Sequence, residues 1–338
     1  MRVLVTGGAG YIGSHTCLEL LRCGHEVSVI DSLHNGSVEA LKRVQLLANY
    51  ALDFCQCDVR DAQAIDLVFD QFHPDVVIHF AGLKAVSESF SDPDLYYEVN
   101  VGGTATLLLA MERGGCENII FSSSATVYGK PHYLPCDENH PLKPINPYGR
   151  TKLAAENLLC DWANAKLSRH AVALRYFNPV GADASGLIGE DPNDIPNNLM
   201  PFISQVAVGR QDYLQIFGDD YDTIDGTGVR DYIHVTDLAQ AHIAALEHFS
   251  ILEPFEVMNV GTGIGLSVLQ LVQEFEKQSG RSVPRQIAPR RQGDVTAVWA
   301  DSNKAFSKLK FATKFGVAEM CQDTWRWQSR YPMGYEDE

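Results

Sequence analysis

The chain has 338 residues, 45% of them hydrophobic and 21% charged, a composition typical of a globular protein large enough for two lobes. Its formal net charge of −16 argues against nucleic acid or an anionic membrane as a partner, because both attract a basic face. The opening residues lack a charged leader and a long apolar core, so we expect no signal peptide, no membrane span and a cytoplasmic location.

Short β-rich runs alternate with helical patterns through the first half, which predicts a parallel sheet flanked by helices. The expected strands cover residues 2–6, 26–30, 54–58, 76–81, 119–124 and 171–177, and the expected helices cover 11–23, 62–72, 95–113 and 148–167. A Gly/Asp/Pro-rich stretch follows, and a later strand at 257–260 is expected to return to the first sheet. The predicted fold class is α/β: a Rossmann-like, doubly wound parallel sheet with a smaller, C-terminal α/β substrate lobe.

The predicted domain boundaries follow from the point at which the alternation of strands and helices gives way to the Gly/Asp/Pro-rich stretch. Residues 1–177 are predicted to form the dinucleotide-binding domain, with 230–262 partly returning to it, and 178–338 to form mainly the substrate lobe.

Eight cysteines are scattered along the chain, and the close pair Cys55 and Cys57 has no second pair or histidine cluster beside it. We therefore expect reduced thiols and no metal site.

A glycine-rich loop joins the first expected strand to the first expected helix. Glycines at these positions permit a tight turn, a close approach of the backbone to a pyrophosphate, and packing of the helix on the strand. The helix N-terminus adds N–H groups and a partial positive charge. This context predicts a dinucleotide site formed by Gly7, Gly10, Tyr11, Ile12 and Gly13.

Acidic residues end the second and third strands. Asp31 can accept hydrogen bonds from the adenosine ribose hydroxyls, which favours NAD over NADP because a 2′-phosphate would meet a negative charge. The alternative is that Asp31 caps a turn before Ser32. Asp58 is a weaker candidate for the adenine edge, since aspartate after a strand is also ordinary turn chemistry.

Tyr148 and Lys152 lie four residues apart at the start of an expected helix behind Pro147, so both belong to one helical face. A nearby ammonium and a positive nicotinamide would favour phenolate and lower the pKa of Tyr148. Ser124, at the carboxyl end of a strand, would share the substrate oxygen with Tyr148. The alternatives are a coincidental helix-surface pair and a serine that only ends a strand.

Seven segments carry a resemblance to a known family: residues 3–15, 78–86, 121–129, 175–181, 195–201, 226–235 and 288–294. Along nearly its whole length the sequence resembles the UDP-glucose 4-epimerases, which are extended short-chain dehydrogenases/reductases. The resemblance implies an isomerase that interconverts UDP-glucose and UDP-galactose through a 4-keto intermediate, with tightly bound NAD regenerated in each turnover. It implies that Tyr148 is the base, that Lys152 holds the nicotinamide ribose, and that Ser124 binds the sugar 4-hydroxyl.

The resemblance also assigns contacts on both sides of the site. The further cofactor residues are Ser32, Asn35, Asp58, Val59, Phe80, Ala81, Gly82, Lys84, Asn100 and Phe177. The substrate residues are Lys84, Ser124, Tyr148, Asn178, Asn198, Gln215, Phe217, Arg230, Arg291, Asp294 and Val298. Arginine forks suit a pyrophosphate, although Arg230 or Arg291 taken singly could be a surface ion-pair residue. Likewise, Lys84 could be a solvated loop lysine and Asn100 a structural amide.

Val298 departs from relatives that carry a bulky tyrosine beside the sugar. The smaller side chain leads us to expect that N-acetylated UDP-hexosamines are accepted as well, unless a neighbour such as Trp299 fills the space. The apolar spacing of the helices 95–113 and 148–167, together with the resemblance, implies a homodimer, although packing within one subunit would explain much of the same pattern.

Three rival functions remain open. A nucleotide-sugar 4,6-dehydratase needs an added acid and base, but the segment Ser124-Ala125-Thr126 offers no carboxylate. Decarboxylation or epimerisation of a uronic acid would need another cation at the sugar. A non-catalytic NAD-sensing protein could keep the fold alone, but the intact Ser124, Tyr148 and Lys152 argue against it.

Overall fold

A seven-stranded parallel sheet forms the centre of the protein in a computed structural model that describes residues 1–192, 196, 198–291 and 293–336. The strand order is β10-β6-β5-β4-β1-β2-β3, so the order reverses between β1 and β4. The strands are β1 (Arg2–Thr6), β2 (Glu26–Asp31), β3 (Asp53–Gln56), β4 (Val76–His79), β5 (Asn118–Ser124), β6 (His170–Tyr176) and β10 (Phe255–Val260). This topology confirms the predicted Rossmann-like fold class and places β10 beside β6, as expected.

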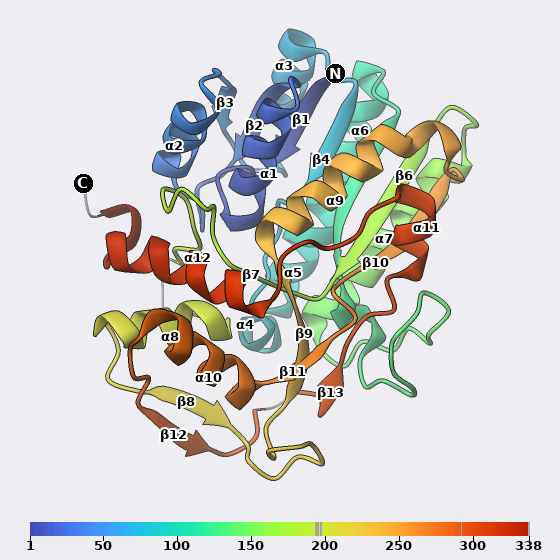
Figure 1. The fold of residues 1–338 in the computed structure, drawn as a ribbon. Coiled ribbons are helices and arrows are strands. Elements are labelled where there is room, and N and C mark those ends of the chain that lie inside the picture. Colours follow the sequence, from blue (N-terminus) through green and yellow to red (C-terminus); the bar gives the residue numbers. More distant parts are fainter. Residues whose placement is uncertain (193–195, 197, 292, 337–338) are drawn as a thin grey trace.

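Helices cover both faces of the sheet (Figure 1). One face packs against α1 (Tyr11–Arg22), α2 (Val38–Ala48), α9 (Val235–His248) and α11 (Asn303–Leu309), and the other against α3 (Ala62–Phe72), α6 (Gly103–Gly114) and α7 (Pro147–Asn164). Strand residues alternate between the two cores: Val3 and Val5 belong to the first and Leu4 to the second. The continuous apolar strands are explained by burial on both faces.

The second half of the chain builds a smaller unit below the carboxyl-terminal edge of the sheet, as Figure 1 shows. Its elements are β7 (Asn178–Val180), α8 (Leu199–Val208), β8 (Leu214–Phe217), β9 (Val229–His234), β11 (Gly265–Ser267), α10 (Val268–Ser279), β12 (Arg285–Ala288), β13 (Ala297–Val298) and α12 (Val317–Arg330). Strand β9 pairs with β7, β11 and β13, and β8 pairs with β12. A separate hydrophobic core lies between these elements.

The expected helix over residues 95–113 is wrong in detail. The chain instead forms α4 (Val86–Ser91), α5 (Pro93–Tyr97), a π-helical turn at Glu98–Gly102, and then α6. Gly103 lets the chain pass close to Val59, since a Cβ at this glycine would lie 2.5 Å from the valine side chain. The prediction also missed α2, whose N-cap Ser37 accepts a hydrogen bond from the backbone N–H of Glu39.

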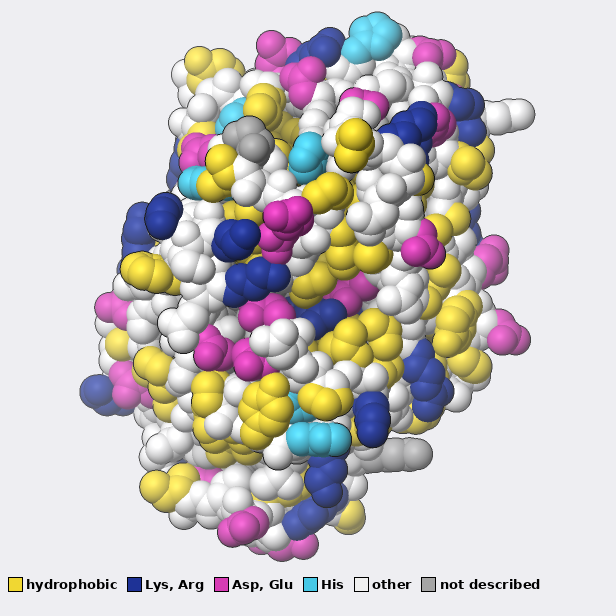
Figure 2. All heavy atoms as spheres, turned by 90° about the vertical axis from the view of Figure 1, so that its right-hand side faces the viewer, with side chains coloured by type: hydrophobic (Ala, Val, Ile, Leu, Met, Phe, Trp, Pro, Cys, Tyr) yellow, Lys and Arg dark blue, Asp and Glu magenta, His cyan; other side chains and the backbone are white. Residues whose placement is uncertain are grey.

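No helix among the described residues is both long and apolar enough to cross a membrane. The eight cysteines all lie in described segments and are free thiols. On the face drawn in Figure 2, acidic and basic side chains are interspersed with hydrophobic ones rather than collected in one basic patch.

Candidate active site

The glycine loop turns sharply between β1 and α1. Gly7 has φ +73°, and a Cβ there would lie 2.6 Å from the backbone nitrogen of Ala81. A Cβ on Gly13 would collide with the carbonyl oxygen of Gly7. Gly10 is the N-cap of α1, so Tyr11 and Ile12 form the first turn, where N–H groups lack partners within the helix. This cradle lies at the reversal of strand order and fits a dinucleotide pyrophosphate.

Asp31 ends β2 beside this loop and is buried. Its carboxylate accepts hydrogen bonds from the backbone N–H groups of Ala9 at 2.9 Å and Leu33 at 2.8 Å. Burial raises the pKa of Asp31, and these hydrogen bonds oppose the rise. Asp31 therefore ties the loop after β2, which carries the exposed Ser32 and Asn35, to the glycine loop.

Asp58 is engaged by its own neighbour. The Arg60 guanidinium donates to the Asp58 carboxylate from Nε at 2.9 Å and from Nη2 at 2.7 Å, and these hydrogen bonds lower the pKa of Asp58. The adjacent Val59 is buried. The backbone N–H of Arg60 also donates to Asp58 at 2.8 Å, which is the turn chemistry considered as the alternative for Asp58.

The loop after β4 lies against the glycine loop. The backbone N–H groups of Phe80 and Ala81 both donate to the carbonyl of Thr6, at 2.9 and 3.1 Å. Asn100 is buried in the π-helical turn, where its Oδ1 accepts from the N–H of Leu83 at 2.7 Å and its Nδ2 donates to the Leu83 carbonyl at 3.0 Å.

Asn100 also reaches the helix that carries the tyrosine and lysine, because its Nδ2 donates to Thr151 Oγ1 at 3.0 Å. Gly82 lies in the same loop, where a Cβ would approach Asn100 Oδ1 to 2.9 Å and Lys152 Nζ to 3.8 Å. Asn100 therefore acts as a structural amide that joins the two parts of the site.

Helix α7 begins in a way that fixes Tyr148. Pro147 occupies the first helical position, and the Asn146 side chain accepts a hydrogen bond of 2.7 Å from the N–H of Gly149. One turn later, the Lys152 ammonium is buried and donates to the Ser122 carbonyl at 2.8 Å. The ammonium lies 5.9 Å from the centroid of the Tyr148 ring. Pro147 was an expected start signal of this helix, whereas the Asn146 cap was not predicted, although asparagine directly before a proline is a recognisable signal in the sequence.

Burial moves both groups toward their neutral forms. It raises the pKa of Tyr148 to about 12, and the hydrogen bond with Ser124 opposes the rise only in part. It lowers the pKa of Lys152 to about 8, although the charge of Glu156 favours the protonated amine. Desolvation therefore dominates the pKa of Tyr148 in the protein alone. The expected lowering of this pKa by the ammonium together with a bound nicotinamide stays a prediction.

Ser124 lies at the end of β5 and caps the short turn that follows. Its Oγ accepts from the N–H of Thr126 at 3.2 Å and the Thr126 hydroxyl at 3.0 Å. The hydrogen bond with Tyr148 brings the predicted catalytic pair together, and Lys152 joins them through the carbonyl of Ser122 on the same strand.

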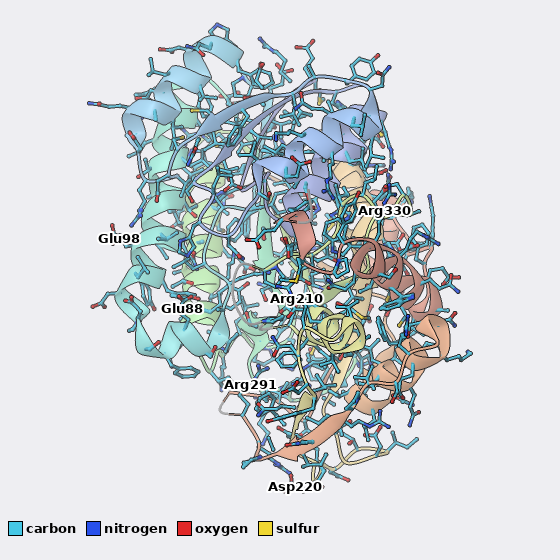
Figure 3. All side chains as sticks on the ribbon, turned by 90° about the vertical axis from the view of Figure 1, so that its left-hand side faces the viewer. Glu88, Glu98, Arg210, Asp220, Arg291 and Arg330 are labelled. Atoms are coloured by element: carbon cyan, nitrogen blue, oxygen red, sulfur yellow. The ribbon has the colours of Figure 1, made fainter. Side chains whose placement is uncertain are left out.

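A second group of predicted residues lies in the smaller unit. Asp294 accepts from Arg291 at 3.1 and 3.3 Å, and Arg230 Nη2 lies 3.8 Å from the same carboxylate. The Arg291 guanidinium lies 5.4 Å from the centroid of Phe217, which shares the exposed face of β8 with Gln215. In Figure 3, Arg291 lies between Glu88 of the larger unit and Asp220 of the smaller one.

Two contacts link this group to the sheet. Val298 pairs with Arg230 in the register of β13 with β9, and it packs in a buried cluster with Phe177. Phe177 and Asn178 lead directly from β6 into β7. Trp299, directly after β13, lies against Gly265 of β11.

Lys84 and Asn198 form a third group. Both donate to Oε1 of Glu190, at 3.2 and 2.7 Å respectively, and Glu190 was not predicted. A cavity of about 360 Å³ lies elsewhere, between the loop after β10 and α11, and none of the predicted residues lines it. The described residues contain no group of three or more histidine, cysteine or acidic side chains arranged to hold a metal ion.

The NAD dependent epimerase/dehydratase family model matches residues 3–261 of this chain. The chain belongs to this family. Among curated members, the UDP-glucose 4-epimerase of Bacillus subtilis is 53% identical over 99% of both chains. The human UDP-glucose 4-epimerase is 52% identical over 99% of this chain and 98% of its own length.

Solved members of the epimerase/dehydratase family have the same fold. The UDP-glucose 4-epimerase of Bifidobacterium longum, in complex with NAD+ and UDP, is 46% identical with a TM-score of 0.96, and the match covers 99% of this chain and 100% of that one. That of Stenotrophomonas maltophila, with bound NAD and formylated UDP-arabinopyranose, is 47% identical with a TM-score of 0.95, over 98% and 99% of the two chains. These matches confirm the predicted family, fold class and NAD cofactor.

Proposed function

We propose that the protein is an NAD-dependent isomerase that interconverts UDP-glucose and UDP-galactose through a 4-keto sugar. The observation that carries the proposal is the grouping of Ser124, Tyr148 and Lys152 beside the glycine loop. The similarity to UDP-glucose 4-epimerases over almost the whole chain supports the choice of substrate. When bound, NAD would supply a hydride acceptor at its nicotinamide ring and, in its reduced form, a hydride donor.

The chain's own residues have distinct tasks in this reaction. Ser124 holds the 4-hydroxyl of the sugar, and Tyr148 removes its proton and later returns it. Lys152 binds the nicotinamide ribose, and its ammonium is fixed by the Ser122 carbonyl. The glycine loop and Asp31 hold the cofactor, with Phe80, Ala81 and Phe177 around it. Burial raises the pKa of Tyr148 to about 12, and a positive nicotinamide nearby would favour the deprotonated form.

The residues of the smaller unit bind the uridine diphosphate. Arg230 and Arg291 supply positive charge at the site of an acidic protein; Asp294 accepts hydrogen bonds from Arg291 and lies 3.8 Å from Arg230. Phe217 and Gln215 face the same side of β8. Asn178, Asn198 and Lys84 complete the substrate contacts. In this proposal, residues 1–177, with part of 230–262, form the NAD domain, and 178–338 form mainly the substrate lobe.

Val298 leaves room beside the sugar, so N-acetylated UDP-hexosamines are also substrates. Its contact with the Phe177 cluster and its pairing with Arg230 support a position in the wall of the site. The Val298→Tyr variant is expected to lose turnover of UDP-N-acetylgalactosamine while it keeps that of UDP-galactose. Wild-type rates on UDP-N-acetylglucosamine far below those on UDP-glucose would contradict this part of the proposal.

Two further features belong to the proposed function. A homodimer forms through α6 and α7; Leu109 of α6 and Leu167, just after the end of α7, are exposed apolar residues. The enzyme works in the cytoplasm, which the eight free thiols support because disulfides are rare in reducing compartments. Sedimentation at several protein concentrations tests the first feature.

The test of the proposed function uses the purified protein without added cofactor. Denaturation is expected to release NAD rather than NADP, and the native protein is expected to convert UDP-galactose to UDP-glucose with no NAD supplied. A 4-keto-6-deoxy product would identify a dehydratase instead. Bound NAD without any turnover of the sugar would favour the non-catalytic alternative.

A further inference from the structure

Glu190 connects the two units of the protein at the candidate site. It lies between β7 and α8, and its side chain is only 9% exposed. Its Oε1 accepts from Lys84 Nζ at 3.2 Å and from Asn198 Nδ2 at 2.7 Å. Lys84 belongs to the loop after β4 in the larger unit, and Asn198 is the N-cap of α8 in the smaller unit. One carboxylate oxygen therefore links residues of both units.

The Glu190 side chain lies near α1 and α12. The Tyr11 hydroxyl donates to the Gly181 carbonyl at 2.7 Å, and burial together with the nearby Glu190 charge raises the pKa of Tyr11. On the other side, Glu190 lines a small cavity with Thr324 and Trp327 of α12. The carboxylate is thus enclosed between the first turn of the cofactor helix and the C-terminal helix.

The C-terminal segment braces the backbone on both sides of Glu190. The Tyr335 hydroxyl lies 3.3 Å from both the N and the O of Gly189. The backbone N–H of Tyr335 donates to the Asp191 carboxylate at 2.8 Å. Tyr335 therefore contacts the backbone of Gly189 and the side chain of Asp191, the two residues that flank Glu190.

A carboxylate bonded to two proposed substrate contacts is unfavourable by itself for an anionic UDP-sugar, because like charges repel. Its presence is explained if it organises the groups that the diphosphate needs. Lys84 is a long side chain, 47% exposed, that would otherwise sample many rotamers. A charge-assisted hydrogen bond to an anchored carboxylate restricts it, and the same oxygen orients the amide of Asn198.

We propose that Glu190 is a positioning residue that orients Lys84 and Asn198 toward the UDP-sugar across the two units. The proposal rests on the proposed function for the identity of the ligand. It acts on binding of the substrate and not on the proton transfer at Tyr148. The expected effect is therefore on substrate affinity, with little change in the chemical step.

The test is the Glu190→Gln variant, which keeps the shape of the side chain and removes its charge. Calorimetry with UDP on the NAD-loaded protein is expected to show a Kd raised about tenfold, as for the loss of one charge-assisted hydrogen bond. The KM for UDP-galactose is expected to rise by a similar factor and kcat to change less than about twofold. Glu276→Gln is the matched control, since Glu276 pairs with Arg285 at 3.2 Å in the smaller unit.

A double-mutant cycle with Lys84→Met separates positioning from general stability. The effect of Glu190→Gln is expected to shrink in the Lys84→Met background, because the two residues act through one contact. Unchanged or tighter UDP binding in Glu190→Gln would overturn the proposal. The proposal would also be overturned if the weaker UDP binding came with a loss of bound NAD and a lower melting temperature. That pattern indicates a merely structural role. If the wild type fails to convert UDP-galactose, the proposed function falls, while UDP binding still decides the role of Glu190.

Discussion

At the scale of single residues, the site depends on two buried ionisable groups of opposite kinds. Burial separates their pKa values, to about 12 for Tyr148 and about 8 for Lys152. The spacing of these residues predicts their shared helical face, but it could not predict that the ammonium would be directed at the Ser122 carbonyl. The desolvation of these two side chains depends on the surrounding fold, so it cannot be predicted from a five-residue motif.

The first prediction concerns Tyr148. Tyr148→Phe removes the proton-transfer group and is expected to lower kcat by a factor of about 100 or more, the usual contribution of general acid–base catalysis. Bound NAD and melting temperature should stay close to those of the wild type. Tyr133→Phe is the control, because Tyr133 is an exposed tyrosine that donates to Asp137. Full turnover by Tyr148→Phe would rule out its role as the base.

The second prediction concerns the arginines of the smaller unit. Arg230→Met is expected to weaken UDP binding about 10- to 100-fold, the loss of charge-assisted hydrogen bonds worth about 1.5–3 kcal/mol. Arg290→Met should change it less than about twofold, since Arg290 pairs with the exposed Asp220 at 2.7 Å. Calorimetry measures UDP binding by both variants. If the two substitutions weaken UDP binding equally, the net charge of the protein and not the position of Arg230 controls the affinity.

At the scale of elements, the π-helical turn between α5 and α6 sets the geometry of the site. The sequence predicts one helix there because its apolar spacing continues through the turn. It cannot predict the turn itself, which depends on Val59 packing against Gly103 and on Asn100 reaching the loop after β4. These are contacts between residues far apart in the chain.

The third prediction follows from this turn. Asn100→Ala leaves the N–H and carbonyl of Leu83 without their side-chain partner and is expected to lower the free energy of unfolding by about 2–4 kcal/mol. The loop after β4 should loosen, so less NAD should remain bound after purification. Asn164→Ala on α7 is the control, because its exposed amide donates to the carbonyl and the Sγ of Cys160, one helical turn away on the same helix. A wild-type NAD content and denaturation midpoint in Asn100→Ala would contradict this account.

At the scale of the whole molecule, late parts of the chain complete the first sheet. Alternating strands and helices predict the parallel sheet and the return of β10. They could not predict the pairing of β9 with three short strands, since two- and three-residue strands carry almost no periodic signal. The same limit explains why Glu190 was missed: it lies in a Gly/Asp/Pro-rich loop, and its importance comes from the folded arrangement.

The fourth prediction concerns the ion pairs that join β10 to α11 and the pH dependence of the stability they provide. Buried Glu256 of β10 accepts from Lys304 at 2.8 Å and Lys308 at 3.3 Å, both on α11. Burial would raise the pKa of Glu256, but the two ammonium groups outweigh it and hold the pKa below its ordinary value. A depressed carboxylate pKa stabilises the fold above the unfolded-state pKa, and this contribution is lost as pH falls through the folded-state pKa.

Glu256→Gln is therefore expected to lower the free energy of unfolding at pH 7 by about 1–3 kcal/mol. The difference from the wild type should shrink below about pH 4, where the glutamate becomes protonated. The exposed Glu253, on the loop before β10, provides the control substitution Glu253→Gln. Urea unfolding at both pH values measures the effect, and a difference that is independent of pH would contradict the linkage.

The central claim is that hydride leaves carbon 4 of the sugar and returns to the same carbon within one active site. The most direct measurement supplies UDP-galactose carrying deuterium at carbon 4 to the purified protein without added NAD. The account predicts UDP-glucose that keeps the deuterium at carbon 4. Product in which the label has been replaced by hydrogen from water would contradict it.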